Sequence, residues 1–184
     1  TKPVISVCAV RTGSGKSQTT RRIAGILREH GLKVAAIRHP MPYGNLEKQR
    51  VQRFGSIADL KKHECTIEEI EEYEPHIVSG TIIYAGVDYG DILAQAQAEA
   101  DVILWDGGNN DTPFYKPDLH IVVADPLRVG NELLYHPSET NLRIADVVII
   151  NKVDSAGIDA INTLRQNIRR VNGRATIIEA ASPI

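Results

Sequence analysis

The chain has 184 residues, a formal net charge of −2 and 42% hydrophobic residues, with only 5% aromatic residues. This length fits one domain with a sizeable core, and the near-neutral charge argues against a general nucleic-acid-binding protein. No apolar stretch is long enough to span a membrane and no signal peptide is visible, so we expect neither a membrane nor a nucleic-acid partner.

The two cysteines are far apart in the sequence and form no C-x-x-C pair. This argues against a disulfide framework and against a thiolate zinc site. Cys8 falls in an apolar run, where we expect a small buried residue. A reducing cytoplasm is therefore the expected location.

Apolar runs and amphipathic segments alternate along the first part of the chain. A strand is predicted over residues 4–10, then a helix over 16–30 that stops at Gly31, then a strand over 34–37. Two prolines and a glycine predict a loop over 40–45. This order of strand, helix and strand is typical of a parallel α/β sheet.

The middle of the chain is less regular. Residues 46–60 have patchy helical character. Thr66 and Glu69 form a capping box that opens a short acidic helix. A further helix is predicted over residues 91–100.

The second half of the chain is more regular. Strands are predicted over residues 102–105, 120–124, 147–150 and 175–179, with a helix over 158–171. Strands separated by helices imply right-handed crossovers and a mostly parallel sheet, in which ligands bind beyond the carboxyl ends of the strands. The notable polar residues fall at those ends: Lys16, His39, Asp106, Asp125 and Asn151.

The first predicted strand leads into the run Gly13-Ser14-Gly15-Lys16-Ser17. Glycines let backbone N–H groups converge on phosphate oxygens, and the N-terminus of the following helix adds a partial positive charge. Lys16 can reach the β- and γ-phosphates of a nucleotide, and the Ser17 hydroxyl can ligate Mg²⁺. A chance Gly/Ser turn is the alternative, but the flanking strand and helix favour a phosphate loop.

This phosphate loop departs from the full pattern G-x-x-x-x-G-K-[ST] because Val10 stands where the first glycine belongs. Arg11, five residues before Lys16, either lies along the phosphates or is solvated. The residues predicted to bind the nucleotide here are Arg11, Thr12, Gly13, Ser14, Gly15, Lys16, Ser17 and Gln18.

Asp106 closes the run Val-Ile-Leu-Trp and precedes two glycines. A carboxylate at a strand end, across from a phosphate loop, can hold Mg²⁺ directly or through water. Asp106 and Ser17 are therefore the predicted magnesium ligands. A simple turn or helix cap is the alternative for Asp106.

A second polar run, Asn151-Lys152-Val153-Asp154, follows the apolar run Val-Val-Ile-Ile. A carboxylate here can accept hydrogen bonds from N1–H and the exocyclic amine of guanine, which adenine cannot supply. Lys152 can lay its methylene stem along the base. Asn151, Lys152 and Asp154 are therefore predicted to bind the nucleotide base, and backbone N–H groups of residues 180–182 are a weaker candidate.

Charge is unevenly distributed between residues 38 and 76. Residues 38–62 hold six Lys or Arg and two Asp or Glu, whereas residues 63–76 hold six Glu and no Lys or Arg. Solvated helix surfaces account for most of these charges. Arg38 and His39 differ because they end a predicted strand, so we expect them to contact an anionic co-substrate. The role of the acidic segment 64–74 stays open.

Together, the phosphate loop, Asp-Gly-Gly and Asn-Lys-x-Asp predict an α/β, three-layer P-loop NTPase fold, with a mostly parallel sheet and helices on both faces. The chain resembles the P-loop class that includes signal-recognition and dinitrogenase-iron-type enzymes, some of which carry a lysine at the position of Arg11. More narrowly, it resembles the P-loop domain of cyclic 2,3-diphosphoglycerate synthetase. This likeness covers most of the chain and rests on residues 9–18 (AVRTGSGKSQ), 38–44 (RHPMPYG), 105–109 (WDGGN) and 135–154.

The resemblance implies a ligase that transfers the γ-phosphoryl group of ATP to diphosphoglycerate, after which the other phosphate of that acid closes an anhydride. Lys16, Asp106, Arg38 and His39 would be the catalytic residues. The resemblance implies ATP, whereas the argument from Asp154 favours GTP; either nucleotide would bind with Mg²⁺.

We expect residues 1–184 to form a single nucleotide-binding domain that belongs to a longer polypeptide. The expected partners are a nucleotide and a small anionic phosphorylated metabolite, and a homodimer is one candidate assembly. The alternative function is a GTPase switch or metallochaperone-type GTPase that controls a partner protein.

Overall fold

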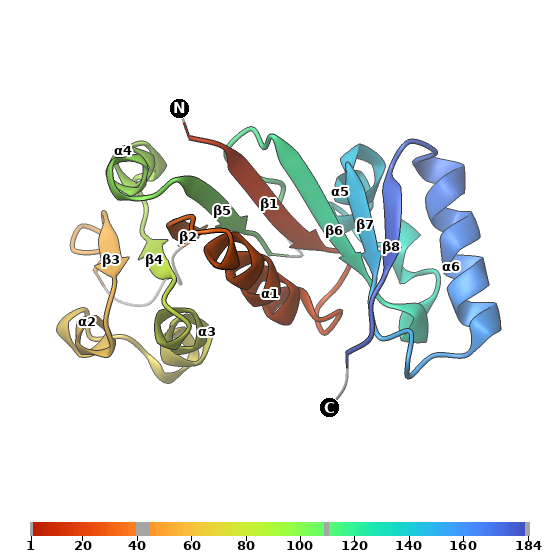
Figure 1. The fold of residues 1–184 in the computed structure, drawn as a ribbon, viewed down its shortest axis with the longest axis horizontal. Helices are drawn as coiled ribbons and strands as arrows, with labels where there is room; N and C mark the ends of the chain where they lie inside the picture. Colours follow the sequence, from red (N-terminus) through yellow and green to blue (C-terminus); the bar gives the residue numbers. More distant parts are fainter. Residues whose placement is uncertain (1, 40–44, 109–110, 183–184) are drawn as a thin grey trace. The chain divides into compact units, whose positions relative to one another are not determined.

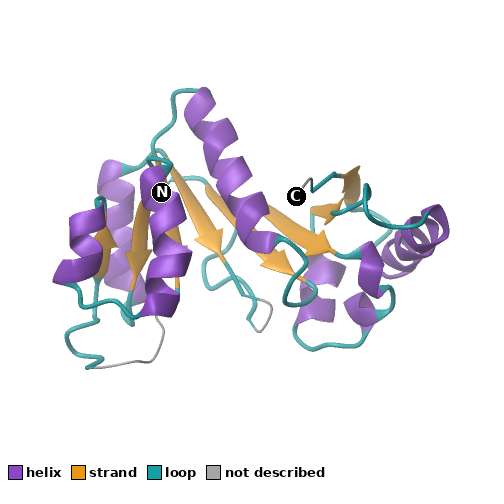
Figure 2. Cartoon of the chain, turned by 90° about the horizontal axis from the view of Figure 1, so that it is seen from below, coloured by secondary structure: helices purple, strands orange, loops and turns teal. Residues whose placement is uncertain are grey.

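The computed structural model describes residues 2–39, 45–108 and 111–182. Helices and strands alternate along most of the chain (Figure 2). The chain forms two compact units. The first holds Thr20–Asp106 with the first few residues of the chain, and the second holds Ile5–Thr19 with the chain from Gly107 onward.

The first unit contains four strands in the order β3-β4-β2-β5. They are β2 (Val34–Arg38), β3 (Gln52–Phe54), β4 (Ile82–Ala85) and β5 (Val102–Asp106). β2 runs parallel to β4 and to β5, whereas β3 runs antiparallel to β4. Every residue of β2 and β5 is buried, as expected of parallel strands that are covered on both faces.

Helices lie on both sides of these strands. They are α2 (Ile57–Lys62), α3 (Ile67–Val78) and α4 (Tyr89–Glu99), together with the part of α1 (Lys16–Glu29) that follows Thr19. Figure 1 shows α4 on one side of β3 and β4, and α2 and α3 on the other. The Thr66 side chain accepts a hydrogen bond from the Glu69 N–H at the start of α3, which confirms the predicted capping box.

The second unit contains four parallel strands in the order β1-β6-β7-β8. They are β1 (Val4–Ala9), β6 (Leu119–Ala124), β7 (Val147–Ile150) and β8 (Thr176–Glu179). The helices α5 (Ser138–Ile144) and α6 (Ile158–Val171) bury one face of these strands. That core contains Val122, Val148 and Ile150 from the strands and Leu142, Leu164 and Ile168 from the helices.

Most predicted strands and helices are confirmed to within one or two residues, but the middle of the chain is corrected. The patchy helix predicted over 46–60 is wrong in part, because this stretch contains the strand β3 before α2 begins at Ile57. The strand β4 and the seven-residue helix α5 were not predicted. The loop predicted over 40–45 lies outside the described residues except for Asn45.

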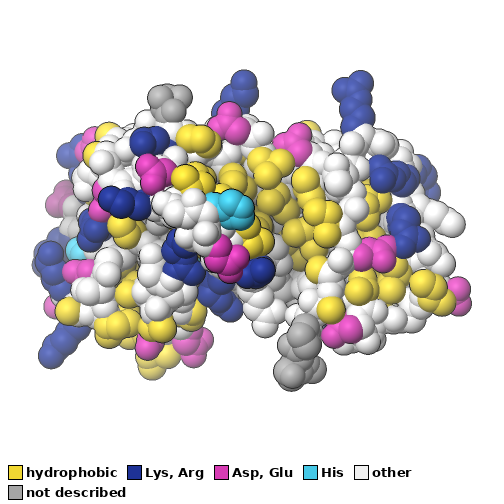
Figure 3. Space-filling view, viewed as in Figure 1, with side chains coloured by type: hydrophobic (Ala, Val, Ile, Leu, Met, Phe, Trp, Pro, Cys, Tyr) yellow, Lys and Arg dark blue, Asp and Glu magenta, His cyan; other side chains and the backbone are white. Residues whose placement is uncertain are grey.

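Several expectations from composition can be compared with the described residues. Cys8 is fully buried in β1, and both cysteines are free thiols. None of the described helices combines the length and the hydropathy that a membrane span needs. On the face seen in Figure 3, acidic and basic side chains are interspersed.

Candidate functional site

The phosphate loop connects β1 to α1 in the second unit. Gly13 and Gly15 have φ angles of 83° and 93°, in the left-handed region that favours glycine. A Cβ atom at Gly15 would lie 2.2 Å from Asn151 Nδ2, whereas at Gly13 it would meet nothing within 4 Å. Gly15 is therefore required both by its backbone conformation and by the close approach of Asn151.

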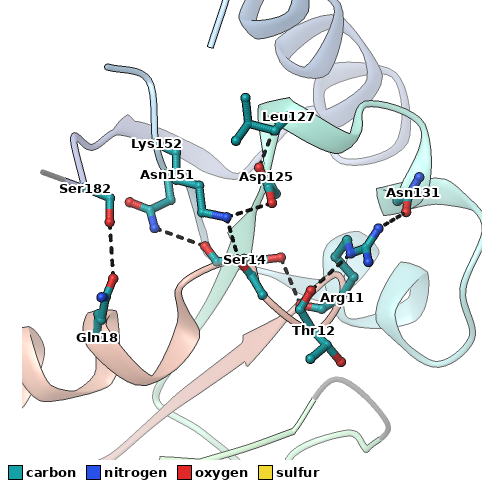
Figure 4. Close-up of polar contacts among 11 residues, drawn as sticks. Arg11, Thr12, Ser14, Gln18, Asp125, Leu127, Asn131, Asn151, Lys152 and Ser182 are labelled. Atoms are coloured by element: carbon teal, nitrogen blue, oxygen red, sulfur yellow. Dashed lines mark hydrogen bonds and ion pairs between the residues drawn. The ribbon is translucent and has the colours of Figure 1, made fainter. Parts of the chain in front are cut away.

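Three backbone carbonyl groups of this loop accept hydrogen bonds from side chains (Figure 4). The Ser14 hydroxyl donates to the Arg11 carbonyl oxygen over 2.9 Å. Lys152 Nζ donates to the Gly13 carbonyl oxygen over 2.6 Å, and Asn151 Nδ2 donates to the Ser14 carbonyl oxygen over 3.0 Å. These bonds fix the orientation of three peptide units of the loop.

A trans peptide unit points its N–H away from its C=O, and the peptides of this loop are trans. When the carbonyls of Arg11, Gly13 and Ser14 are held, the N–H groups of Thr12, Ser14 and Gly15 are therefore directed away from the residues that hold them. A set of fixed amide donors beside the N-terminus of a helix is an anion-binding arrangement.

The remaining predicted residues of the loop lie beside these donors. Lys16 and Ser17 are the first two residues of α1 and are half-buried. Thr12 is exposed. The side-chain oxygen of Gln18 accepts a hydrogen bond from the Ser182 hydroxyl over 3.2 Å.

Arg11 is held by a residue that the sequence did not indicate. Its Nη1 donates to Asn131 Oδ1 over 2.6 Å, and its Nε donates to the Thr12 carbonyl oxygen over 3.1 Å (Figure 4). Asn131 begins the short 3-10 helix Asn131–Leu133, which follows β6 in the chain. Arg11 is therefore half-buried and bound to protein rather than fully solvated.

The run Asn151–Asp154 follows β7 and lies against the phosphate loop. Besides the Gly13 carbonyl, Lys152 Nζ contacts Asp125 Oδ2 over 3.0 Å. Asp154 is exposed and accepts a hydrogen bond from the Ser182 N–H over 3.0 Å. The structure thus brings together the phosphate loop, the Asn-Lys-x-Asp run and residues 180–182, all within the second unit.

Asp106 lies in the first unit, at the end of β5, and its side chain is fully buried. The Thr20 hydroxyl donates to its Oδ1 over 3.1 Å. Its Oδ2 lies 3.4 Å from Arg38 Nη1 and 3.6 Å from Nε2 of His76, which is itself fully buried. Arg38 also forms an ion pair with Glu72, and we refer to Arg38, Glu72, His76 and Asp106 as the Asp106 cluster.

One cation and two carboxylates of the Asp106 cluster are in contact. Burial opposes the charge on Arg38, but the carboxylates of Asp106 and Glu72 more than compensate, so the pKa of Arg38 is raised above its ordinary value. The guanidinium predicted to contact an acceptor is thus already paired with two carboxylates. Glu72 lies in the acidic segment 64–74, and solvated helix surfaces were expected to account for most charges in this region. The sequence did not indicate that Glu72 pairs with Arg38. His39, the next residue after β2, is exposed.

No group of three or more His, Cys, Asp or Glu side chains suited to a metal ion is found in the part of the chain that the structure describes. Magnesium commonly binds through one or two protein carboxylates together with substrate phosphates and water. Ser17 and Asp106 belong to different units, so their joint role as magnesium ligands stays a prediction.

Comparisons with known proteins identify the fold. No protein-family model matches the chain. It is 66% identical over 183 residues to the arginine synthetase ArcE of Thermococcus kodakarensis, and it spans 41% of that relative's length. The relative does not bear the name cyclic 2,3-diphosphoglycerate synthetase that the sequence motifs suggested.

Two solved structures share the fold at low sequence identity. The hydrogenase maturation factor HypB of Archaeoglobus fulgidus matches with a TM-score of 0.61 at 18% identity, over 97% of this chain and 80% of that one. The signal recognition particle 54 kDa protein of Aeropyrum pernix, solved with GDP, matches with a TM-score of 0.52 at 16% identity, over 99% and 42%. The chain therefore has the α/β P-loop NTPase fold that the sequence predicts.

Proposed function

We propose that this chain binds a nucleoside triphosphate with Mg²⁺ on its phosphate loop and serves the nucleotide-dependent step of a synthetase. The observation that carries this proposal is the set of held carbonyls at Arg11, Gly13 and Ser14, which turns the amides of the same peptide units away from the side chains that hold them, beside the N-terminus of α1. The fold and the name of the 66% identical relative support it.

Lys16 is proposed to bind the β- and γ-phosphates, as the sequence suggests. The hydroxyl of Ser17 and the carboxylate of Asp106 are oxygen donors of the kind that magnesium prefers. When bound, the ion would neutralise the charge that develops on the transferred phosphoryl group.

The reaction proposed is transfer of the γ-phosphoryl group to an oxygen of a small acid. The acceptor oxygen forms a bond to the γ-phosphorus while the bond to the β-phosphate oxygen breaks, and a nucleoside diphosphate leaves. A second nucleophile then displaces the new phosphate from the acid. In the cyclic diphosphoglycerate reaction this nucleophile is a phosphate of the same molecule, and in arginine formation it is a nitrogen.

Arg38 and His39 are the residues proposed to contact the acceptor. Because Arg38 is paired with Glu72 and Asp106, an anionic acceptor has to compete with the Glu72 carboxylate for the guanidinium. The relative's name favours an arginine precursor as the acceptor, whereas the sequence motifs favour diphosphoglycerate.

The base is proposed to contact Asp154, Lys152 and the backbone of Ser182. The hydrogen bond from the Ser182 N–H to Asp154 places an amide donor next to a carboxylate acceptor. This bond uses Oδ1 of Asp154, and the carboxylate can still accept hydrogen bonds from N1–H and the exocyclic amine of guanine, which adenine lacks, so Asp154 supports GTP over ATP. A guanine-binding carboxylate also supports the second candidate function, a GTPase that hydrolyses GTP to control a partner protein.

Calorimetry with GDP and ADP in the presence of Mg²⁺ tests the proposal. Lys16→Ala should abolish binding, whereas Lys116→Ala, which removes an exposed lysine of the second unit, should not. Unchanged affinity in Lys16→Ala would refute the phosphate site. Asp154→Asn should weaken GDP more than ADP, and an equal effect on both would remove the argument for guanine.

The acceptor is tested by nucleotide turnover. If the chain serves a synthetase that uses 2,3-diphosphoglycerate, turnover of the triphosphate should depend on adding that acid. If it serves arginine formation, the reverse reaction is the test: arginine, the nucleoside diphosphate and inorganic phosphate should together yield the triphosphate. Rapid GTP hydrolysis with neither compound present would favour the GTPase instead.

A further inference from the structure

Asp125 follows β6 and is 5% exposed. Its two carboxylate oxygens have different partners. Oδ1 accepts a hydrogen bond from the Leu127 N–H over 3.0 Å and so caps the short 3-10 helix Pro126–Arg128. Oδ2 lies 3.0 Å from Lys152 Nζ. The cap fixes the orientation of the carboxylate, and the orientation aims Oδ2 at the lysine (Figure 4).

Lys152 is also held in a fixed conformation. Its φ of 56° lies in the left-handed region, where a residue other than glycine is strained by about 1–2 kcal/mol. Such strain persists only where the surroundings hold the residue in place. Here Nζ is shared between Asp125 Oδ2 and the Gly13 carbonyl oxygen, and the side chain is 23% exposed.

The Gly13 carbonyl oxygen is the third group in this chain of contacts, after the Asp125 carboxylate and Lys152 Nζ. Its peptide unit carries the N–H of Ser14 on the opposite side. A lysine that is fixed by Asp125 therefore fixes the direction of an amide in the phosphate loop, although the side-chain partners of Asp125 are Leu127 and Lys152 and not the loop itself. The sequence pointed to Asp125 only as a polar residue at a strand end.

We propose that Asp125 is a positioning residue that acts through Nζ of Lys152 on the phosphate loop and thereby sets affinity for the phosphates, whereas only the methylene stem of Lys152 would contact the base. This inference rests on the proposed function. This role differs from a contribution to stability alone. A carboxylate that only needed a cation as its partner would not require the same lysine to bind the Gly13 carbonyl as well.

The experiment compares Asp125→Asn, Lys152→Met and the double variant, with inorganic pyrophosphate and GDP as probes in calorimetry. Asparagine keeps an oxygen for the Leu127 N–H but loses the charge that holds Lys152. Asp125→Ser is a second variant, since serine also caps helices. Asp146→Asn is the matched control, because Asp146 is an exposed carboxylate at the other end of the parallel strands, where β7 begins.

Asp125→Asn should weaken pyrophosphate and GDP by the same factor, about tenfold, the size expected for one charge-assisted hydrogen bond. In the Lys152→Met background the same change should cause no further loss. The control should bind both probes as the unchanged protein does. Thermal unfolding of each variant identifies any loss that comes from unfolding.

Two outcomes would overturn the inference while the proposed function stands. One is unchanged pyrophosphate affinity in folded Asp125→Asn and Asp125→Ser, with binding still abolished by Lys16→Ala. The other is a full tenfold loss from Asp125→Asn in the Lys152→Met background, which would show that Lys152 does not carry the effect. If Lys16→Ala leaves pyrophosphate binding intact, the proposed function and this inference both fail.

Discussion

The phosphate loop and the Asp106 cluster both lie where parallel strands end, yet their polar contacts differ in kind. In the loop, side chains of Ser14, Asn151 and Lys152 donate to backbone carbonyls. In the Asp106 cluster, Arg38 lies between two carboxylates, so side chains bind one another. The first arrangement shapes a backbone and leaves its amides for a ligand, whereas the second neutralises charge inside the protein.

This difference separates two ways of losing function. A change in the loop should act mainly on phosphate affinity, because the contacts set the direction of donors. A change in the Asp106 cluster should act first on stability, because it leaves a buried charge without its partner. The following predictions test this distinction, beginning with the largest expected effect.

Arg38→Met should lower the free energy of unfolding by about 3–5 kcal/mol, since it leaves the buried Asp106 carboxylate without its cation. Urea unfolding measures this. Arg53→Met is the matched control, because the Arg53–Glu99 pair lies in the same unit with the Arg53 side chain 43% exposed, where such pairs contribute about 0–1 kcal/mol. Equal losses of stability in the two variants would show that the buried contacts of Arg38 contribute no more than an exposed ion pair.

Gly15→Ala should weaken pyrophosphate by about 2–3 kcal/mol, because left-handed alanine is strained and its Cβ displaces Asn151 from the Ser14 carbonyl. Gly13→Ala has a similar positive φ with open space around the new Cβ, so its backbone strain of about 1–2 kcal/mol should lower stability, and pyrophosphate affinity should fall less than in Gly15→Ala. Calorimetry with pyrophosphate compares them. A loss as large in Gly13→Ala would mean that the approach of Asn151 is unimportant.

In the second unit, the buried side chain of His120 is paired with the side chain of Ser6. Its Nδ1 lies 2.6 Å from the Ser6 hydroxyl, and burial lowers its pKa below the ordinary value of about 6.5, although Asp146 opposes this. Below that pH the unfolded chain takes up a proton that the folded chain does not. Stability should therefore fall as pH falls from about 6.5, by at most about 1.4 kcal/mol per pH unit.

The measurement for His120 is urea unfolding at several pH values between 7.5 and 5.0. His120→Gln should remove this part of the pH dependence and leave pyrophosphate affinity near that of the unchanged protein. If the variant loses stability with falling pH as steeply as the parent, His120 is not the group that titrates.

Thr66→Ala should have the smallest effect, about 1 kcal/mol in the free energy of unfolding, because it removes the cap of α3. This helix carries Glu72 and His76, so the change tests how firmly α3 holds the Asp106 cluster. Urea unfolding measures it, and an unchanged midpoint would show that α3 is held by its packing alone.

The sequence predicts the phosphate loop and the run Asn151–Asp154 because their residue types and spacing specify local backbone geometry. Glycine at a positive φ and polar residues at the ends of buried strands leave clear patterns. The partners Asn131, Glu72 and His76 were missed because their contacts depend on tertiary folding. Arg11 and Asn131, for instance, are 120 residues apart in the chain.

The fold follows the same division. Long apolar runs such as β1, β6 and β7 were found because both faces of parallel strands are apolar. The strand β3 has three residues, Gln52–Phe54, with an arginine at its centre, so no apolar periodicity marks it. The helix α5 is seven residues long, which is too short for a reliable helical period.

The strands β3 of the first unit and β8 of the second, each at one end of its strand order, also affect how the protein behaves at high concentration. Each is short, and each carries a charged side chain in an ion pair, Arg53 with Glu99 and Glu179 with Arg165. Exposed strand edges invite other chains to add strands and aggregate, and short, charged edges resist this. Replacing these charges with apolar residues would therefore lower solubility before it altered nucleotide affinity.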